Sequence, residues 1–203
     1  MMWTRIAFLL AALPLLGCGS SPKTNFFTLE PVKSQIQATQ NGGAAIQLAA
    51  VHIPPALDRR EMVRRTGGEA LDVSDQDRWG APFDEMVQRT LTQDLASRLP
   101  PGRVIYPDQP APTGTDPVVI DILEFANDGA GRVVFQGSWS VLKSGSSVPL
   151  LDQQIRLSAP VGGKDFAGEA EAMSTVLGQL SDRIAARVAG LKAEKTGAQN
   201  APG

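Results

Sequence analysis

The chain contains one cysteine and one histidine among its 203 residues. A single cysteine cannot form an internal disulfide or a cysteine-rich zinc site, and a single histidine cannot supply a multi-histidine metal centre. The 19 basic side chains are balanced by 21 acidic ones, so there is no general electrostatic reason to expect a nucleic-acid partner. These scarcities favour one globular domain of ordinary size that uses no metal and no cofactor.

The N-terminus is typical of a secretory leader, which we expect to cover residues 1–17. Arg5 precedes an apolar run that is shorter than the about 20 residues a membrane-spanning helix needs. The run ends in Leu15-Leu16-Gly17-Cys18, which resembles the bacterial lipobox, where a small residue precedes a cysteine that is acylated and becomes the mature N-terminus. We therefore expect signal cleavage between Gly17 and Cys18 and lipid attachment at Cys18, with acyl chains as the membrane anchor.

The residues after the lipobox suggest a location and a domain plan. Gly19 stands where an aspartate would often signal retention in the inner membrane, so lipoprotein analogy favours the periplasmic face of the outer membrane. Residues 18–25 are expected to be a lipidated cysteine and a flexible tether, and residues 192–203 a disordered tail. The folded domain is expected over residues 26–191.

Several short segments have the pattern of strands. Residues 26–29 begin with two phenylalanines, and residues 45–53 form an apolar run that ends at two prolines. Further along, segments 118–125, 132–142 and 150–158 are separated by glycine-containing turns, and the last two alternate apolar with polar residues. The last three segments therefore predict a β-meander with one packed face and one wet face.

Two longer segments predict helices. Residues 82–99 and 165–191 carry apolar side chains at three- and four-residue spacing, as amphipathic helices do. Pro82 suits a first helical turn, and Pro100 and Pro101 end the first segment. Together the elements predict an α/β (α+β) fold: a single domain with a mixed, mostly antiparallel β-sheet, a β-meander and two long amphipathic helices packed on one face.

The polar segment 58–79 predicts a β-hairpin about Gly67-Gly68. Its first arm is basic and its second arm is acidic, so opposite charges on paired strands would support its register. The simpler interpretation is an exposed, self-complementary hairpin, and the alternative is a partner-docking surface. The candidate docking residues are Arg59, Arg60, Arg64, Arg65 and Trp79.

Residues that could carry catalysis are few. His52 lies in an apolar run, where we interpret it as a hydrogen-bonded strand histidine, and any Ser-His-Asp triad would have to use it. Asp121 and Glu124 interrupt a strand three positions apart, which should point them to opposite faces and prevent joint acid and base catalysis. Solvent exposure or pairing with an arginine is expected for both, and we expect no enzyme.

The order and spacing of several segments resemble the ABC-type transport auxiliary lipoproteins, the PqiC-like (YmbA-like) family. The segments that carry the resemblance are the lipobox at Cys18, Phe26-Phe27-Thr28-Leu29, Ile53-Pro54-Pro55-Ala56-Leu57-Asp58-Arg59, Arg78-Trp79-Gly80-Ala81-Pro82-Phe83 and Gln136-Gly137-Ser138-Trp139. This resemblance implies a cofactor-free accessory, anchored in the outer membrane and facing the periplasm. Its implied partner is an MCE-domain transport protein of a lipid transport system that supports envelope integrity, and its implied assembly is a homo-oligomeric ring.

Two other classes of function stay open at this point. A periplasmic lipid-binding carrier would need an apolar cavity large enough for acyl chains. A periplasmic hydrolase would need an activated nucleophile and would depend on His52. The resemblance favours the accessory subunit over both.

Overall fold

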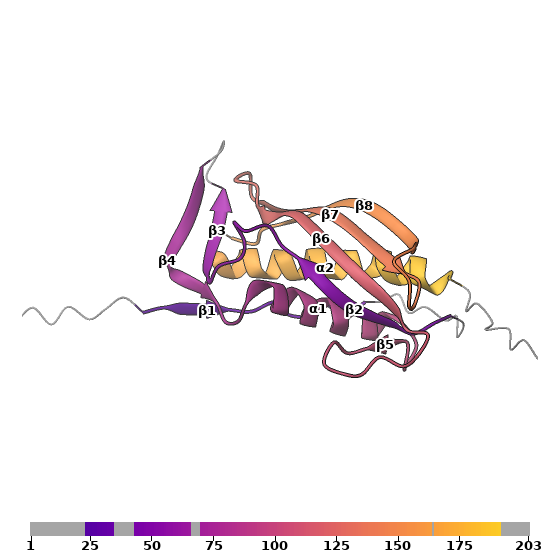
Figure 1. Ribbon diagram of the computed structural model, residues 1–203. Helices are drawn as coiled ribbons and strands as arrows, with labels where there is room; N and C mark the ends of the chain where they lie inside the picture. The colour runs from indigo at the N-terminus through magenta and orange to yellow at the C-terminus, as the bar shows by residue number, and fades with distance from the viewer. Residues whose placement is uncertain (1–22, 35–42, 66–69, 164, 192–203) are drawn as a thin grey trace, which may run out of the picture.

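The computed structural model describes residues 23–34, 43–65, 70–163 and 165–191 (Figure 1). The expected leader, the expected lipidation site at Cys18 and the expected tail at 192–203 lie outside the described residues. Strand β1 begins at Asn25, so the last residue of the expected tether belongs to the fold.

The larger sheet has five strands in the order β5-β2-β6-β7-β8. Strand β2 is parallel to both β5 and β6, whereas β6, β7 and β8 are antiparallel and form the predicted meander. The sheet is therefore mixed, and the predicted α+β class is confirmed. The strands are β2 (Ile46–His52), β5 (Val104–Ile105), β6 (Asp116–Asn127), β7 (Arg132–Leu142) and β8 (Pro149–Pro160).

Two helices cover one face of this sheet, as the apolar stripes predict: α1 (Phe83–Arg98) and α2 (Phe166–Ala189) (Figure 1). Helix α1 begins directly after Pro82, and the side chain of Asp165 caps α2 by accepting a hydrogen bond from the backbone N–H of Gly168. Their apolar sides and the inner face of the sheet form one hydrophobic core. Its largest fully buried side chains include Trp139, Phe125 and Phe135.

The two arms of the predicted hairpin are paired and are part of a second, smaller sheet, while the predicted turn at Gly67-Gly68 lies outside the described residues. Strands β3 (Glu61–Arg65) and β4 (Leu71–Trp79) are antiparallel, and β1 (Asn25–Phe27) pairs with β4 in parallel. The sequence predicted a single sheet, because nothing in its local pattern links residue 25 to residue 77. The three-stranded sheet projects from the end of the molecule where α2 begins (Figure 1).

A β-bulge in β6 corrects one expectation from the sequence. Asp121 pairs with Ser138 and Glu124 pairs with Gln136, while the register shifts between Ile122 and Glu124. The extra residue places both carboxylates on the same face of the sheet, not on opposite faces as strict alternation predicts. Leu123, within the bulge, is 70% exposed.

Candidate docking surface

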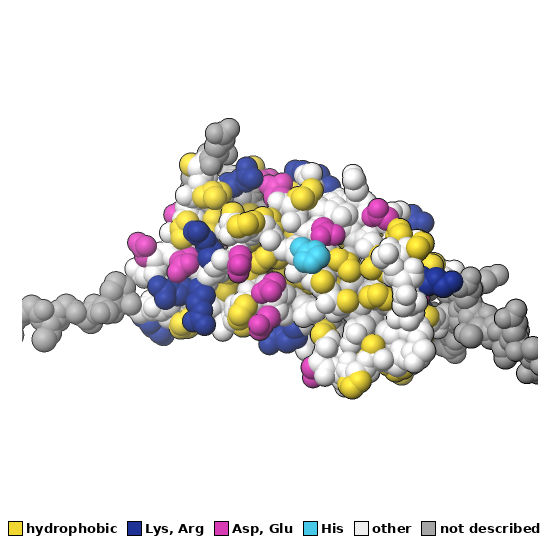
Figure 2. All heavy atoms as spheres, in the orientation of Figure 1, with side chains coloured by type: hydrophobic (Ala, Val, Ile, Leu, Met, Phe, Trp, Pro, Cys, Tyr) yellow, Lys and Arg dark blue, Asp and Glu magenta, His cyan; other side chains and the backbone are white. Residues whose placement is uncertain are grey.

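Exposed apolar side chains lie on β4 of the hairpin and in the β6 bulge, and β3 of the hairpin contacts β6. Leu71 and Val73 of β4 are 50% and 38% exposed, and Leu123 of β6 is 70% exposed. Basic, acidic and hydrophobic side chains are interspersed over this part of the molecule (Figure 2). We call the set formed by Arg65, Leu71, Val73, Leu123 and Glu124 the hairpin–bulge surface.

Ion pairs connect the hairpin–bulge surface to the meander. Arg65 Nε lies 3.7 Å from Glu124 Oε1, and Arg156 Nη1 of β8 lies 3.9 Å from Glu124 Oε2. The pairing of Glu124 with arginines agrees with the expectation for this residue. Because one carboxylate faces cations from two elements, Glu124 links β3 to β8 through the outer face of the sheet.

Arg64, near the turn end of β3, attaches the hairpin to the start of α2. Its Nε lies 3.1 Å from Glu169 Oε1, and its guanidinium carbon lies 3.8 Å from the centre of the Phe166 ring. Glu169 is only 2% exposed and also accepts a hydrogen bond of 3.0 Å from Asn127. Burial raises the pKa of Glu169, while the amide of Asn127 and the charge of Arg64 act in the opposite direction.

The five predicted docking residues differ in how exposed they are. Arg59, Arg60 and Arg65 are exposed, whereas Arg64 is half-buried against α2. Trp79 is 5% exposed, and its ring centre lies 5.0 Å from that of Phe83, which continues into the aromatic core. The indole of Trp79 therefore contributes to the core, and its side chain is not presented to a partner in this structure.

His52 is a hydrogen-bonded strand histidine, as predicted. Its Nδ1 lies 2.7 Å from Asp121 Oδ1, and both side chains are more than half exposed. Within the part of the chain that the structure describes, no group of three or more histidine, cysteine or acidic side chains could hold a metal ion. None of the helices described is both long and apolar enough to span a membrane.

A second polar cluster, which sequence reasoning missed, lies between the two helices around Arg98. Arg98 is 2% exposed and donates from Nε to Asp182 at 2.6 Å, and from Nη1 to Asp94 at 3.1 Å and to the backbone oxygen of Val32 at 3.1 Å. Its Nη2 also donates to the backbone oxygen of Gly178. The only sign in the sequence was the i, i+4 spacing of Asp94 and Arg98, which is equally common on solvated helix faces.

Asp94 has an unusual ionisation because it is fully buried. Burial raises its pKa from 3.8 to about 6, although the charge of Arg98 and a hydrogen bond of 2.8 Å from the backbone N–H of Val32 lower it. The backbone of Val32 thus bonds to both members of the Asp94–Arg98 pair. The residues that follow β1 are therefore held tightly against the helices.

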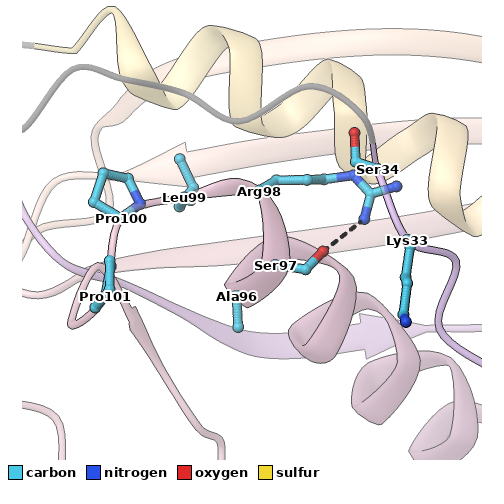
Figure 3. A pocket seen from close by; sticks show the side chains of 8 residues that line it. All are labelled: Lys33, Ser34, Ala96, Ser97, Arg98, Leu99, Pro100 and Pro101. Carbon is cyan, nitrogen blue, oxygen red and sulfur yellow. Dashed lines mark hydrogen bonds between the residues drawn. The ribbon is translucent and has the colours of Figure 1, made fainter.

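An open pocket of about 530 Å³ lies beside this cluster, and Figure 3 shows Arg98 reaching from α1 between Ser34 and Ser97. It is lined by Lys33, Ser34, Ala96, Ser97, Arg98, Leu99, Pro100 and Pro101. A second pocket of about 650 Å³, between α1 and the loop after β5, is lined mostly by polar side chains. Neither pocket is the enclosed apolar cavity that a lipid carrier would need.

Comparison with known proteins identifies relatives by sequence. A family model described as ABC-type transport auxiliary lipoprotein component matches residues 27–185. The intermembrane transport lipoprotein PqiC of Escherichia coli (strain K12) is 28% identical over 141 residues, which cover 68% of this chain and 74% of that protein. Its namesake from Shigella flexneri matches to the same extent.

Two crystal structures share the fold at low sequence identity. An uncharacterised protein superposes with a TM-score of 0.66 at 18% identity, over 82% of this chain and 99% of its own. A protein of Xanthomonas campestris superposes with a TM-score of 0.61 at 14% identity, over 81% of this chain and 93% of its own. The arrangement of two helices on a mixed sheet is therefore an established fold.

Proposed function

The chain belongs to the ABC-type transport auxiliary lipoprotein family, and we propose that it is a lipid-anchored accessory subunit of an intermembrane lipid transport system. The relative from Escherichia coli is named as an intermembrane transport lipoprotein, which supports this assignment. In this proposal the protein has no enzymatic role. It holds a transport partner near a bilayer and thereby supports the integrity of the envelope.

The anchor in this proposal is Cys18, acylated after cleavage behind Gly17. The sequence Leu15-Leu16-Gly17-Cys18 at the end of an apolar run supports it, and Gly19 supports placement in the outer membrane, facing the periplasm. Cys18→Ala should abolish incorporation of a labelled fatty acid and release the protein from the membrane fraction. Unchanged labelling and fractionation of that variant would exclude the anchor.

The partner in this proposal is an MCE-domain transport protein, which docks on the hairpin–bulge surface. The observation that carries the proposal is the set of exposed apolar side chains at Leu123 in the β6 bulge and at Leu71 and Val73 of the hairpin, which Arg65 connects through its ion pair with Glu124. The hairpin itself is held to α2 by the pair of Arg64 and the buried Glu169. Exposed apolar side chains on a firmly held scaffold are typical of protein-binding surfaces. The lipid anchor raises the local concentration of the protein at the membrane surface, so weak contacts with the partner suffice.

Site-specific photocrosslinking in the native envelope tests the docking surface. A photoreactive residue in place of Leu123 should give a crosslinked product in which mass spectrometry identifies an MCE-domain protein. The matched control is Val148, which is 60% exposed in the turn between β7 and β8. Crosslinking of the MCE-domain protein at position 148 and not at 123 would show that the docking surface lies elsewhere on the domain. Crosslinking at neither position would count against this partner.

Self-association into a ring is part of the proposal and has its own measurement. Detergent-extracted lipoprotein should give one mass several times that of the monomer in native mass spectrometry. A strictly monomeric species over the concentrations found in the envelope would remove the ring from the proposal.

A further inference from the structure

The N-terminal segment is attached to the folded domain at a defined end. Strand β1 pairs with β4 with Asn25 opposite Asp77, and the side-chain amide of Asn25 donates to Asp77 at 2.8 Å. The chain then follows the helices, where the backbone N–H of Glu30 donates to Ser174. Lys23, where the described chain begins, therefore lies at the hairpin end of the molecule (Figure 1).

The hydrogen bonds further along the segment keep it from shifting. The backbone of Val32 bonds to Asp94 and Arg98, and the hydroxyl of Ser34 donates to Asp182 at 3.0 Å. These contacts reach both α1 and α2, so the path from residue 25 to residue 34 is part of the packed structure. The point at which the chain leaves toward Cys18 is thus fixed on the domain.

The distance from that point to Cys18 is short compared with the molecule. Five residue steps separate Cys18 from Lys23, and an extended chain gains at most about 3.6 Å per residue, or about 18 Å in all. Helix α2 alone has 24 residues and is about 36 Å long at about 1.5 Å per residue. With Cys18 acylated and held in the bilayer, the β1 end of the domain must therefore stay near the membrane. The far end of α2 cannot face the bilayer while the β1 end points away from it.

The β1 end presents an exposed aromatic ring among charges of both signs, which include Arg78 opposite Phe26 and the exposed Arg59 and Arg60 near the end of β4. Phe26 is 64% exposed. Lys23 and Asp75 are exposed nearby in the chain or the sheet, and the carboxylate of Asp77 accepts hydrogen bonds from Asn25 and Ser74. Phenylalanine side chains enter the boundary between headgroups and acyl chains, whereas mixed charges give no electrostatic attraction to anionic lipid.

We propose that the β1 end of the domain is a membrane-contact surface, with Phe26 inserted in the lipid interface and the turn between β7 and β8 directed away from the bilayer. This orientation rests on the proposed anchor at Cys18. It goes beyond the docking proposal because it places the hairpin–bulge surface in the half of the domain nearest the membrane. The transport partner must then approach to within a short distance of the lipid surface to dock.

The orientation is tested on the full mature lipoprotein in phosphatidylcholine vesicles. Acylation blocks the thiol of Cys18, so a cysteine introduced elsewhere is the only free thiol in the chain. An environment-sensitive fluorophore is attached in Phe26→Cys, in Gln76→Cys on exposed β4, and in the control Val148→Cys. We expect a blue-shifted emission at position 26, and at least a twofold weaker quenching by aqueous iodide at positions 26 and 76 than at position 148.

The outcomes separate this proposal from the anchor. Equal quenching at the three positions, or stronger shielding at 148, would overturn the orientation while leaving the anchor in place. Mass spectrometry of the N-terminal peptide is read first, and a peptide without acyl chains would overturn both. Gln76→Cys reports the same end of the molecule if Phe26→Cys does not fold, so the test does not depend on one variant.

Discussion

The guanidinium of Arg98 in α1 donates from Nε to a carboxylate oxygen of Asp182 in α2 at 2.6 Å. Arg98 is 2% exposed and Asp182 is 37% exposed, so the bond runs from the interior of the helix pair toward its surface. The same guanidinium bonds to Asp94 and to the backbone of Val32. One side chain therefore connects α1, α2 and the N-terminal segment.

Replacing this arginine should destabilise the fold strongly. Arg98→Met keeps most of the side-chain volume but leaves the fully buried Asp94 without its cation. Removing one partner of a buried ion pair costs about 3 to 5 kcal/mol, so we expect the free energy of unfolding in urea to fall by that amount. The control Arg183→Met changes an exposed arginine of α2 and should stay within about 0.5 kcal/mol of the parent. Similar losses in both variants would contradict a central role for Arg98.

Asp94 should make the stability depend on pH. Its pKa is raised from 3.8 to about 6 by burial, so the folded protein binds this proton more tightly than the unfolded chain. The stabilisation that comes from protonated Asp94 is complete below about pH 4 and is lost as the pH rises through about 6. Across that pH window Asp94 should lower the unfolding free energy of the parent by up to about 3 kcal/mol, and Asp94→Asn should lack this contribution.

Urea unfolding at a series of pH values checks this expectation. Burial also raises the pKa of Glu169, which contributes with the same sign, so some slope should remain in Asp94→Asn. Parallel stability curves for the parent and the variant would show that Asp94 does not titrate in this window.

Gly137 should be intolerant of any side chain. It lies opposite the β6 bulge, and a Cβ at this position would collide with the backbone carbonyl oxygen of Asp121. Because that oxygen belongs to the central sheet, Gly137→Ala should cost at least about 1 to 3 kcal/mol of unfolding free energy. At Gly162 a Cβ would meet nothing within 4 Å, so Gly162→Ala is the matched control and should be nearly neutral. Equal stability of the two variants would refute the close approach at Gly137.

Arg64 should control the attachment of the hairpin more than the stability of the whole domain. Arg64→Met removes the ion pair with Glu169 and the cation over Phe166. We expect amide hydrogen exchange in β3 to speed up at least about tenfold while β7 is unchanged, because local opening requires less energy than global unfolding. Arg59→Met alters an exposed arginine before β3 and serves as the control. A uniform acceleration in all strands would indicate global destabilisation instead.

Most of the fold could be predicted because its signals are local. The alternation in residues 132–142 and the stripes of the two helices depend on neighbours within one or two turns, and the structure confirms them. The pairing of Asn25 with Asp77 and the cluster around Arg98 join residues that are far apart in the chain, and periodicity contains no information about them. The bulge at Leu123 places Asp121 and Glu124 on the same face, against expectation, because one extra residue shifts a two-residue period.

The candidate surface was foreseen only in outline. Charge patterning pointed to the hairpin, yet it did not distinguish the exposed Arg59 and Arg60 from Arg64, which packs against Phe166. It also placed Trp79 on a surface, although the ring is buried against Phe83. Leu123 could not be identified from the sequence because an apolar residue in an apolar strand ordinarily faces the core.

The parallel pairing of β1 with β4 has a mechanical consequence. A pull along β1 from its N-terminal end would load its hydrogen bonds to β4 in shear and would not open them one at a time. Behind that pairing, the bonds of Val32 to Asp94 and Arg98 carry whatever force β1 transmits. Tension applied at the start of β1 would thus be distributed over the small sheet and both helices, without a disulfide or any other covalent cross-link between these elements.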